Sequence, residues 1–146
     1  MKFLSFLFVL SIFVLSACAP SALPTATPTD AMKGVPMSPK LPDNFITPHF
    51  TDSAPAHGDV LKQAPDKLTL NFNFTLKETS VVTVEKDGKA LSIANPVFGD
   101  KRLSMTAALP SGSGEGLYVV KYKACWPDNS CHNGQFGFLV DSKTGK

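Results

Sequence analysis

Short segments with alternating apolar and polar residues predict that this 146-residue chain folds mainly as an all-β domain. In the clearest segment, Leu68, Leu70 and Phe72 alternate with polar residues, a period of two that is typical of a half-buried strand. Turn residues separate such segments, and we find no amphipathic helix of useful length. About seven short strands in roughly a hundred residues predict an immunoglobulin-like antiparallel β-sandwich.

The expected strands can be placed in order along the chain. The first two are expected at 49–53 and 67–74, the last two at 117–125 and 135–141, and the others between them, including 82–84 and 103–109. Turn signals lie at Pro65-Asp66, Asp87-Gly88, Asn95-Pro96, Gly99-Asp100 and in the glycine-rich segment 111–116. Tyr118 follows that segment, at the position of a tyrosine corner.

The topology of such a sandwich predicts which loops meet. The loop between the second and third strands and the loop between the last two strands share one end. The first strand runs antiparallel to the second, so its start lies at that end too. We therefore expect His49, which begins the first strand, to lie close to His132 in the last loop, 126–133. His57, in the turn after the first strand, is expected at the opposite end.

Residues 1–17 predict a lipoprotein signal peptide. A basic start at Met1-Lys2 and a short apolar run lead into Leu15-Ser16-Ala17-Cys18, which has the form of a lipobox. The run is too short for a stable spanning helix. We expect a mature chain that begins at a lipidated, acylated Cys18 and lies in the cell envelope, on the periplasmic face. Ala19 favours the outer membrane where there are two. The alternative is a secreted protein cut near Ala17.

The segment 18–48 predicts an extended linker between the lipidated cysteine and a folded head. It is rich in Pro, Thr, Ser and Ala and has no helical or strand periodicity, as in semi-flexible stalks. The head is expected at 49–141, followed by a short tail at 142–146. Met32 and Met37 in the linker offer soft Cu(I) ligands, although isolated linker methionines more often have no such role.

The charge and cysteine content narrow the function classes. Without Lys2 the mature chain has 13 basic and 12 acidic side chains, and this near neutrality argues against nucleic-acid binding. We expect a monomer that contacts the membrane only through its lipid.

With Cys18 lipidated, Cys125 and Cys131 remain, and an oxidising compartment predicts a disulfide between them. The alternative is a reduced pair that, with His132, binds Cu(I) or zinc.

The densest group of reactive side chains lies at 125–132. Asp128 and His132 offer oxygen and nitrogen ligands, and His49 at the same end would complete two imidazoles and a carboxylate, a set that suits Cu(II). A hydrolase built from Asp128, Ser130, Cys131 and His132 is disfavoured, because neighbouring loop residues rarely converge as a catalytic group must. We therefore expect a binding protein and no enzyme.

The region 49–141 resembles the CopC domain of bacterial copper-resistance and copper-homeostasis proteins. His49 opens the region, and Ser53-Ala54-Pro55-Ala56-His57-Gly58 looks like the Ser-x-Pro-Ala-x-Gly signature of that family. The other matching residues are Leu61, Pro65, Leu68, Leu70, Phe72, the run Gly116-Leu117-Tyr118-Val119-Val120, and Gly134, Phe136, Phe138 and Val140 after a histidine.

The resemblance implies an extracytoplasmic copper-binding β-sandwich. The resemblance implies a Cu(II) site formed by the first histidine of the domain, a carboxylate and a histidine near the last strand. His49 and His132 match the two histidines, and Asp128 is the nearest carboxylate but not a strict match. In typical members the first histidine is also the amino terminus, whereas His49 lies inside this chain. An Asp-Gly-His triplet is typical where this chain has Ser130-Cys131-His132, and the cysteine pair is not part of the common pattern. Met105 is expected in the core.

These observations predict a membrane-anchored protein that buffers or delivers copper for resistance or homeostasis. Cu(II) is favoured over Cu(I), and a copper transporter or chaperone is the expected partner. The alternative is a CopC-like module without metal that serves as an interaction domain at the cell envelope. The internal position of His49 and the inexact ligand spacing motivate that alternative, and Trp126 would then lie on the binding surface.

Overall fold

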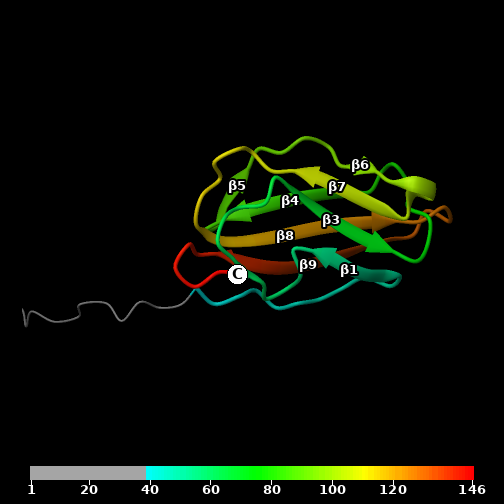
Figure 1. Cartoon of the computed structure of the whole chain (residues 1–146). Helices are drawn as coiled ribbons and strands as arrows, with labels where there is room; N and C mark the ends of the chain where they lie inside the picture. The colour runs from blue at the N-terminus through cyan, green and yellow to red at the C-terminus, as the bar shows by residue number, and fades with distance from the viewer. Residues whose placement is uncertain (1–38) are drawn as a thin grey trace, which may run out of the picture. The chain divides into compact units, whose positions relative to one another are not determined.

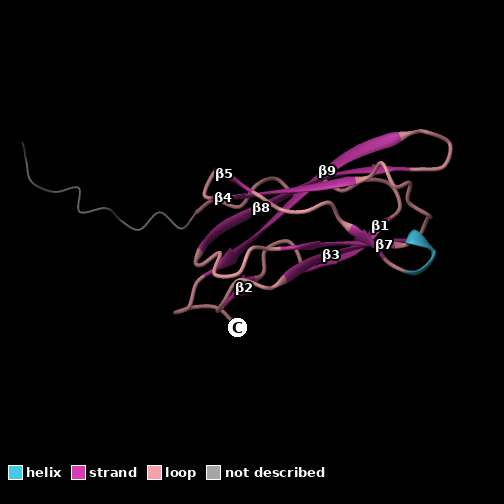
Figure 2. Cartoon of the chain, turned by 90° about the horizontal axis from the view of Figure 1, so that it is seen from above, coloured by secondary structure: helices cyan, strands magenta, loops and turns pink. Residues whose placement is uncertain are grey.

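Two β-sheets face each other in the computed structural model, which describes residues 39–146 (Figures 1 and 2). The strands are β1 (Phe50–Ala54), β2 (Val60–Leu61), β3 (Lys67–Phe72), β4 (Val81–Lys86), β5 (Lys89–Leu91), β6 (Val97–Phe98), β7 (Ser104–Ala108), β8 (Gly116–Cys125) and β9 (Cys131–Val140), with a short 3-10 helix η1 (Asp100–Arg102). One sheet has the order β1-β3-β7-β6 and the other β2-β9-β8-β4-β5. The predicted all-β sandwich is confirmed.

The core forms where the inward-facing residues of both sheets meet. In β3 the buried residues alternate with more exposed ones, and Leu68 and Leu70 are completely buried. In β8 and β9 the same alternation buries Tyr118, Phe136 and Phe138. Each large apolar side chain buried in this way stabilises the fold by roughly 1.5–3 kcal/mol relative to its exposed state. The alternation that predicted the strands therefore also supplies the core.

The hairpin of β8 and β9 carries the end of the molecule on which the candidate site depends. The two strands pair continuously from Gly116 opposite Val140 to Cys125 opposite Cys131. Strand β9 thus begins at Cys131, earlier than the predicted 135. The connection is a tight turn closed by a hydrogen bond of 2.9 Å from the Trp126 amide to the Ser130 carbonyl. His132 consequently lies on a strand, which corrects its expected place in a longer loop.

The first predicted strand is β1 in one sheet, and a short strand that was not predicted, β2, follows it in the other sheet. Strand β1 pairs antiparallel with β3, whereas β2 pairs parallel with β9, so the second sheet is mixed. The connection holds His57, whose ring nitrogen Nδ1 accepts a hydrogen bond of 3.2 Å from the Gly137 amide. Gly137 lies near the end of β9 at Val140, so His57 lies away from the turn that holds Asp128, in agreement with its expected position.

Contacts with the sandwich extend beyond 49–141 on both sides. Phe45 and Gln135 exchange two backbone hydrogen bonds of 3.2 and 2.8 Å, so the chain ahead of His49 runs along β9. The Lys146 amide donates a bond of 3.0 Å to the Val60 carbonyl at the other terminus. The predicted signal peptide, Cys18 and the linker up to residue 38 lie outside the described residues. Within 39–146, no helix is long and apolar enough to cross a membrane.

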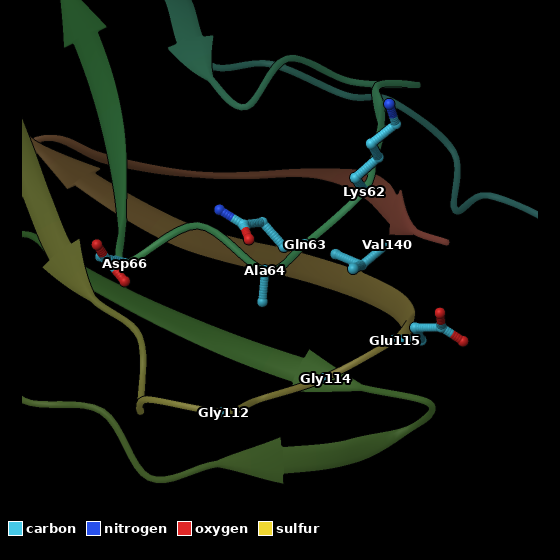
Figure 3. Close-up of a pocket in the computed structure, with 8 residues that line it drawn as sticks. All are labelled: Lys62, Gln63, Ala64, Asp66, Gly112, Gly114, Glu115 and Val140. Carbon is cyan, nitrogen blue, oxygen red and sulfur yellow. The ribbon is translucent and has the colours of Figure 1, made fainter. Parts of the chain in front are cut away.

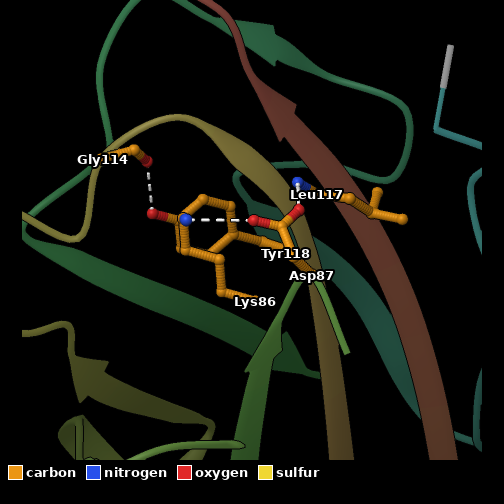
Figure 4. Close-up of polar contacts among 5 residues, drawn as sticks. All are labelled: Lys86, Asp87, Gly114, Leu117 and Tyr118. Atoms are coloured by element: carbon orange, nitrogen blue, oxygen red, sulfur yellow. Dashed lines mark hydrogen bonds and ion pairs between the residues drawn. The ribbon is translucent and has the colours of Figure 1, made fainter. Parts of the chain in front are cut away.

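The predicted tyrosine corner is present at the start of β8 (Figure 4). The Tyr118 hydroxyl donates a hydrogen bond of 2.6 Å to the Gly114 carbonyl, and burial raises the pKa of this phenol. Beside it, the Asp87 carboxylate accepts a bond of 2.9 Å from the Leu117 amide and pairs with Lys86 at 3.0 Å. Both contacts favour the charged form and lower the pKa of Asp87.

Candidate functional site

His49 occupies the residue directly before β1 and is held there by Asn73, the residue directly after β3. The His49 carbonyl accepts a hydrogen bond of 2.9 Å from the Asn73 amide. Its ring nitrogen Nδ1 lies 3.0 Å from Oδ1 of the Asn73 side chain. These two contacts hold both the backbone and the imidazole of His49. The other ring nitrogen, Nε2, does not bond to Asn73.

Two aromatic rings flank the imidazole of His49. Phe74 stacks on it at a centroid distance of 4.9 Å and an interplanar angle of 26°. Trp126 packs nearly perpendicular to it, at a centroid distance of 5.3 Å and an angle of 87°. Trp126 is 4% exposed and also contacts Phe72 in the core, so the imidazole rests against the end of the core while Phe74 is 46% exposed. The packing fixes the plane of the imidazole ring.

His132 lies at the exposed start of β9, opposite Ala124 of β8. Side chains opposite each other in an antiparallel pair project from the same face of the sheet. Ala124 is completely buried on the inner face, so His132 projects from that face where the sheet reaches solvent. Its backbone position is set by the hairpin, and its exposed side chain is accessible to a ligand.

Asp128 lies in the turn between β8 and β9, fully exposed to solvent. Its oxygen Oδ1 accepts hydrogen bonds from the Ser130 amide at 2.9 Å and from the Ser130 hydroxyl at 2.7 Å. These bonds lower the pKa of Asp128, and the positive charge of His132 lowers it further. The carboxylate is therefore ionised near neutral pH and close to His132, and Ser130 engages only its oxygen Oδ1.

The predicted disulfide between Cys125 and Cys131 is present and closes this turn. It joins the last residue of β8 to the first of β9, with the two Cα atoms 4.1 Å apart. Cys125 is 1% exposed, whereas Cys131 is exposed. In this form the sulfurs are joined to each other and are not available as thiolate ligands. The disulfide instead restricts the turn that carries Asp128 and the strand start that carries His132.

The three predicted ligands lie on neighbouring elements at one end of the sandwich. Trp126 connects them, because it touches His49 and begins the turn that contains Asp128 and leads to His132. Among residues 39–146, however, no three His, Cys, Asp or Glu side chains are gathered closely enough to hold a metal ion. The donor atoms suit Cu(II), which accepts imidazole nitrogen and carboxylate oxygen.

A surface hollow at the other end of the sandwich does not compete as a metal site (Figure 3). Its volume is about 350 Å³, and its lining includes Lys62, Asp66, Gly114 and Glu115. Neither imidazole nor thiol lines it, and Figure 3 shows the Asp66 and Glu115 carboxylates on opposite sides, pointing away from each other. Their arrangement offers no convergent set of ligands.

The surroundings of His49 were not predicted from the sequence. Asn73 and Phe74 fall in the segment 67–74, which was expected to be a strand throughout, whereas β3 ends at Phe72. The two residues that bend away from the strand are those that contact His49. The position of Asn73 after an alternating apolar run is a weak turn signal that could have indicated this end of β3.

Comparisons with known proteins agree with this architecture. The CopC domain family matches residues 50–141, beginning directly after His49. CopC from Methylosinus trichosporium OB3b superposes with a TM-score of 0.59 at 24% identity, covering 64% of this chain and 92% of that one. PcoC, a methionine-rich copper resistance protein from Escherichia coli, superposes with a TM-score of 0.59 at 21% identity, covering 66% and 100%.

No curated protein matches the chain. The two solved structures, at identities below 25%, support the β-sandwich fold, and the family match over 50–141 covers most of the sandwich. The chain therefore belongs to the CopC domain family.

Proposed function

We propose that this protein binds copper at the end of the sandwich where His49 meets the turn between β8 and β9. The observation that carries the proposal is the contact of His49 with Trp126, at a centroid distance of 5.3 Å. It places the histidine that precedes the family domain against the turn that holds Asp128 and leads to His132. The similar structure from Escherichia coli is that of a copper resistance protein, which supports the same function.

The available donor atoms favour Cu(II). His49 Nε2, the His132 imidazole and the Asp128 carboxylate are nitrogen and oxygen ligands of the kind that Cu(II) accepts. Cu(I) prefers thiolate and thioether ligands, but Cys125 and Cys131 are joined as a disulfide and Met105 is completely buried. Copper bound here would supply a Lewis-acidic centre, and the chain's own residues would hold and shield it.

We further propose that the protein works outside the cytoplasm, anchored through a lipid on Cys18. The predicted lipobox and the proline-rich linker support an anchored head that buffers copper or delivers it to a transporter or chaperone. The disulfide fits an oxidising compartment. Labelling with a radioactive fatty acid, with Cys18→Ser as the control, tests the anchor: label in the Cys18→Ser variant would exclude it.

A Cu(II) titration of the soluble chain tests the copper function. The soluble chain is defined as residues 18–146 with Cys18→Ser and an acetylated amine, so that the new amino terminus cannot bind copper. The protein has one tryptophan, and Cu(II) bound at His49 should quench its fluorescence. Electron paramagnetic resonance of the same samples reports nitrogen ligands.

The three histidines provide matched variants for this titration. Binding should be stoichiometric in the parent and in His57→Ala, because His57 lies away from the turn that holds Asp128. It should be weakened in both His49→Ala and His132→Ala. Binding that is indifferent to the last two changes would exclude the proposed ligands, and no binding at micromolar Cu(II) would exclude the function.

The second candidate function is that of a metal-free interaction module. Two observations favour it: no three-ligand group is assembled within the described part of the chain, and Phe74 beside His49 is 46% exposed. An exposed aromatic side chain at the end of a sandwich is a suitable contact for a protein partner. A soluble chain that folds but does not bind copper would support this alternative.

A further inference from the structure

We propose that Asn73 determines which nitrogen of His49 is offered to copper. The Asn73 side chain holds the tautomer with a proton on Nδ1, so that the lone pair of Nε2 becomes the ligand. This inference rests on the proposed copper function for its consequence, but the tautomer itself is a property of the metal-free protein. Asn73 is on this view a positioning residue that acts through His49.

The first argument is the hydrogen bond between the two side chains. A neutral imidazole has one N–H donor and one acceptor nitrogen, and an amide oxygen can only accept. With Nδ1 of His49 3.0 Å from Oδ1 of Asn73, the proton of the pair belongs to Nδ1. The other nitrogen, Nε2, is then unprotonated. The reversed amide would donate from Nδ2 and select the opposite tautomer, so the two arrangements can be separated experimentally.

The second argument is that the ring has little freedom to turn. Phe74 stacks on one face of the imidazole, and Trp126 packs nearly perpendicular to it. A half-turn about the bond from Cβ to the ring would carry Nδ1 away from Asn73 and break the hydrogen bond. Trp126 is nearly completely buried, so its ring is held by the core. The ring of His49 packs against it and is restricted in turn.

The third argument is that Asn73 also supports the backbone of His49. His49 has φ of 67°, a left-handed conformation that a residue other than glycine adopts at a cost. The hydrogen bond of 2.9 Å from the Asn73 amide to the His49 carbonyl offsets part of that cost. One residue after β3 therefore holds both the backbone and the ring of the residue before β1.

The consequence concerns how an internal histidine can bind copper. A histidine can chelate a metal through Nδ1 together with its own backbone nitrogen, but Nδ1 of His49 is engaged by Asn73. His49 is thus restricted to a single bond through Nε2. A hydrogen bond from the other ring nitrogen fixes the orientation of a metal-binding imidazole and raises its basicity. Asn73 accepts that hydrogen bond and is not itself a copper ligand.

Long-range ¹⁵N–¹H correlation spectra of the metal-free soluble chain test the tautomer directly. At about pH 8 histidine side chains are neutral, and each ring nitrogen then reports whether it carries a proton. We expect His49 with protonated Nδ1 and bare Nε2. Asn73→Leu should shift His49 toward the tautomer with a proton on Nε2, whereas Asn73→Asp keeps an oxygen acceptor and should retain the parent spectrum.

Copper affinity of the same variants tests the consequence. Asn73→Leu removes the hydrogen bond that favours the tautomer of His49 with a bare Nε2. Cu(II) binding should therefore weaken about fivefold, equivalent to about 1 kcal/mol. Asn73→Asp should bind at least as tightly as the parent. Asn71→Leu is the matched control: Asn71 bonds to Asp52 at 2.6 Å, so its loss should leave the tautomer and the copper affinity unchanged.

The outcomes separate this inference from the proposed function. A proton on Nε2 of His49 in a copper-binding parent would overturn the role of Asn73 alone, as would an unchanged tautomer in Asn73→Leu. A parent with the expected tautomer but no copper binding would overturn the copper function, and with it the ligand role of Nε2. Fivefold weaker binding in Asn71→Leu as well would exclude a specific effect of Asn73.

Discussion

The Trp126 ring and the imidazole of His49 pack nearly perpendicular to each other, at a centroid distance of 5.3 Å and an angle of 87°. His49 precedes β1 in one sheet, and Trp126 follows β8 in the other, so this pair joins the two sheets at one end. The contact makes the orientation of an exposed imidazole depend on a side chain that belongs to the core.

Replacing Trp126 should test this dependence. Trp126→Ala should lower the free energy of unfolding by about 3–5 kcal/mol because it removes a large buried ring, and it should weaken Cu(II) binding by releasing His49. Trp126→Phe retains an aromatic contact and should cost less than half as much, with copper affinity near that of the parent. Urea denaturation followed by circular dichroism and competition with a copper chelator measure both quantities. Equal copper affinity in the two variants would contradict the proposed coupling.

Removing the disulfide should loosen the turn without unfolding the sandwich. The two cysteines are 6 residues apart, and closing so short a loop stabilises the folded state by about 2 kcal/mol in the chain-entropy description. The double variant Cys125→Ala and Cys131→Ala should lose about that amount in urea denaturation. Amide hydrogen exchange should accelerate by a larger factor at Asn129 and Ser130 than at Leu70 in β3, which reports only the loss of global stability. Equal acceleration at Leu70 would show that the effect is global.

The pKa of the Asp128 carboxyl group should depend on Ser130. The two hydrogen bonds from Ser130 depress the pKa of Asp128 below its ordinary value of about 3.9. The stabilisation of the folded turn by these two bonds is fully present at a pH above that ordinary pKa. It is lost as the pH falls through the depressed pKa. Ser130→Ala should therefore raise the pKa of Asp128, measured by carboxyl ¹³C titration, and acid should release Cu(II) at a higher pH than in the parent.

A suitable control for this titration is Ser113→Ala. The Ser113 hydroxyl donates to the Pro110 carbonyl in a different turn, so its loss should leave the pKa of Asp128 unchanged. An unchanged pKa of Asp128 in Ser130→Ala would disprove the assignment of Ser130 as the main cause.

Thr47 and Tyr122 should respond to substitution in opposite directions. Thr47 is 4% exposed, and its hydroxyl oxygen has no hydrogen-bond partner within residues 39–146. Thr47→Val replaces this hydroxyl with a methyl group and should raise the free energy of unfolding by up to about 1 kcal/mol. Tyr122→Phe removes the oxygen that accepts the Thr47 amide at 3.3 Å and should lower it by about 1–2 kcal/mol. Thermal unfolding of both variants measures the signs, and destabilisation by Thr47→Val would contradict the unpaired hydroxyl.

The local patterns of the sequence were sufficient for most of the sandwich. Alternation at 68–72 and 118–124 predicted which side chains are buried, because the period of two belongs to the strand itself. The tyrosine corner at Tyr118 was also predicted, since it depends on a glycine-rich turn only a few residues away. The disulfide followed from the count of cysteines in a chain that was expected to be exported.

The sequence-based predictions missed features that depend on pairing between segments far apart in sequence. Strand β9 was expected to start at 135, after a loop at 126–133, yet the register of the hairpin continues to Cys131. Strand β2 was not expected, yet the chain crosses to the second sheet after β1 and pairs there with the end of β9. Neither pairing leaves a local signature in the sequence.

By itself, the sequence determined the fold class, the core-facing residues, the cysteine pair and the resemblance to the CopC domain, because each depends on local periodicity, composition or spacing. Tertiary structure alone decided the surroundings of His49. Asn73 is 24 residues away and Trp126 belongs to the other sheet. Their contact with one imidazole depends on the register of β1 against β3 and on the packing of the two sheets, which arise only when the whole sandwich assembles.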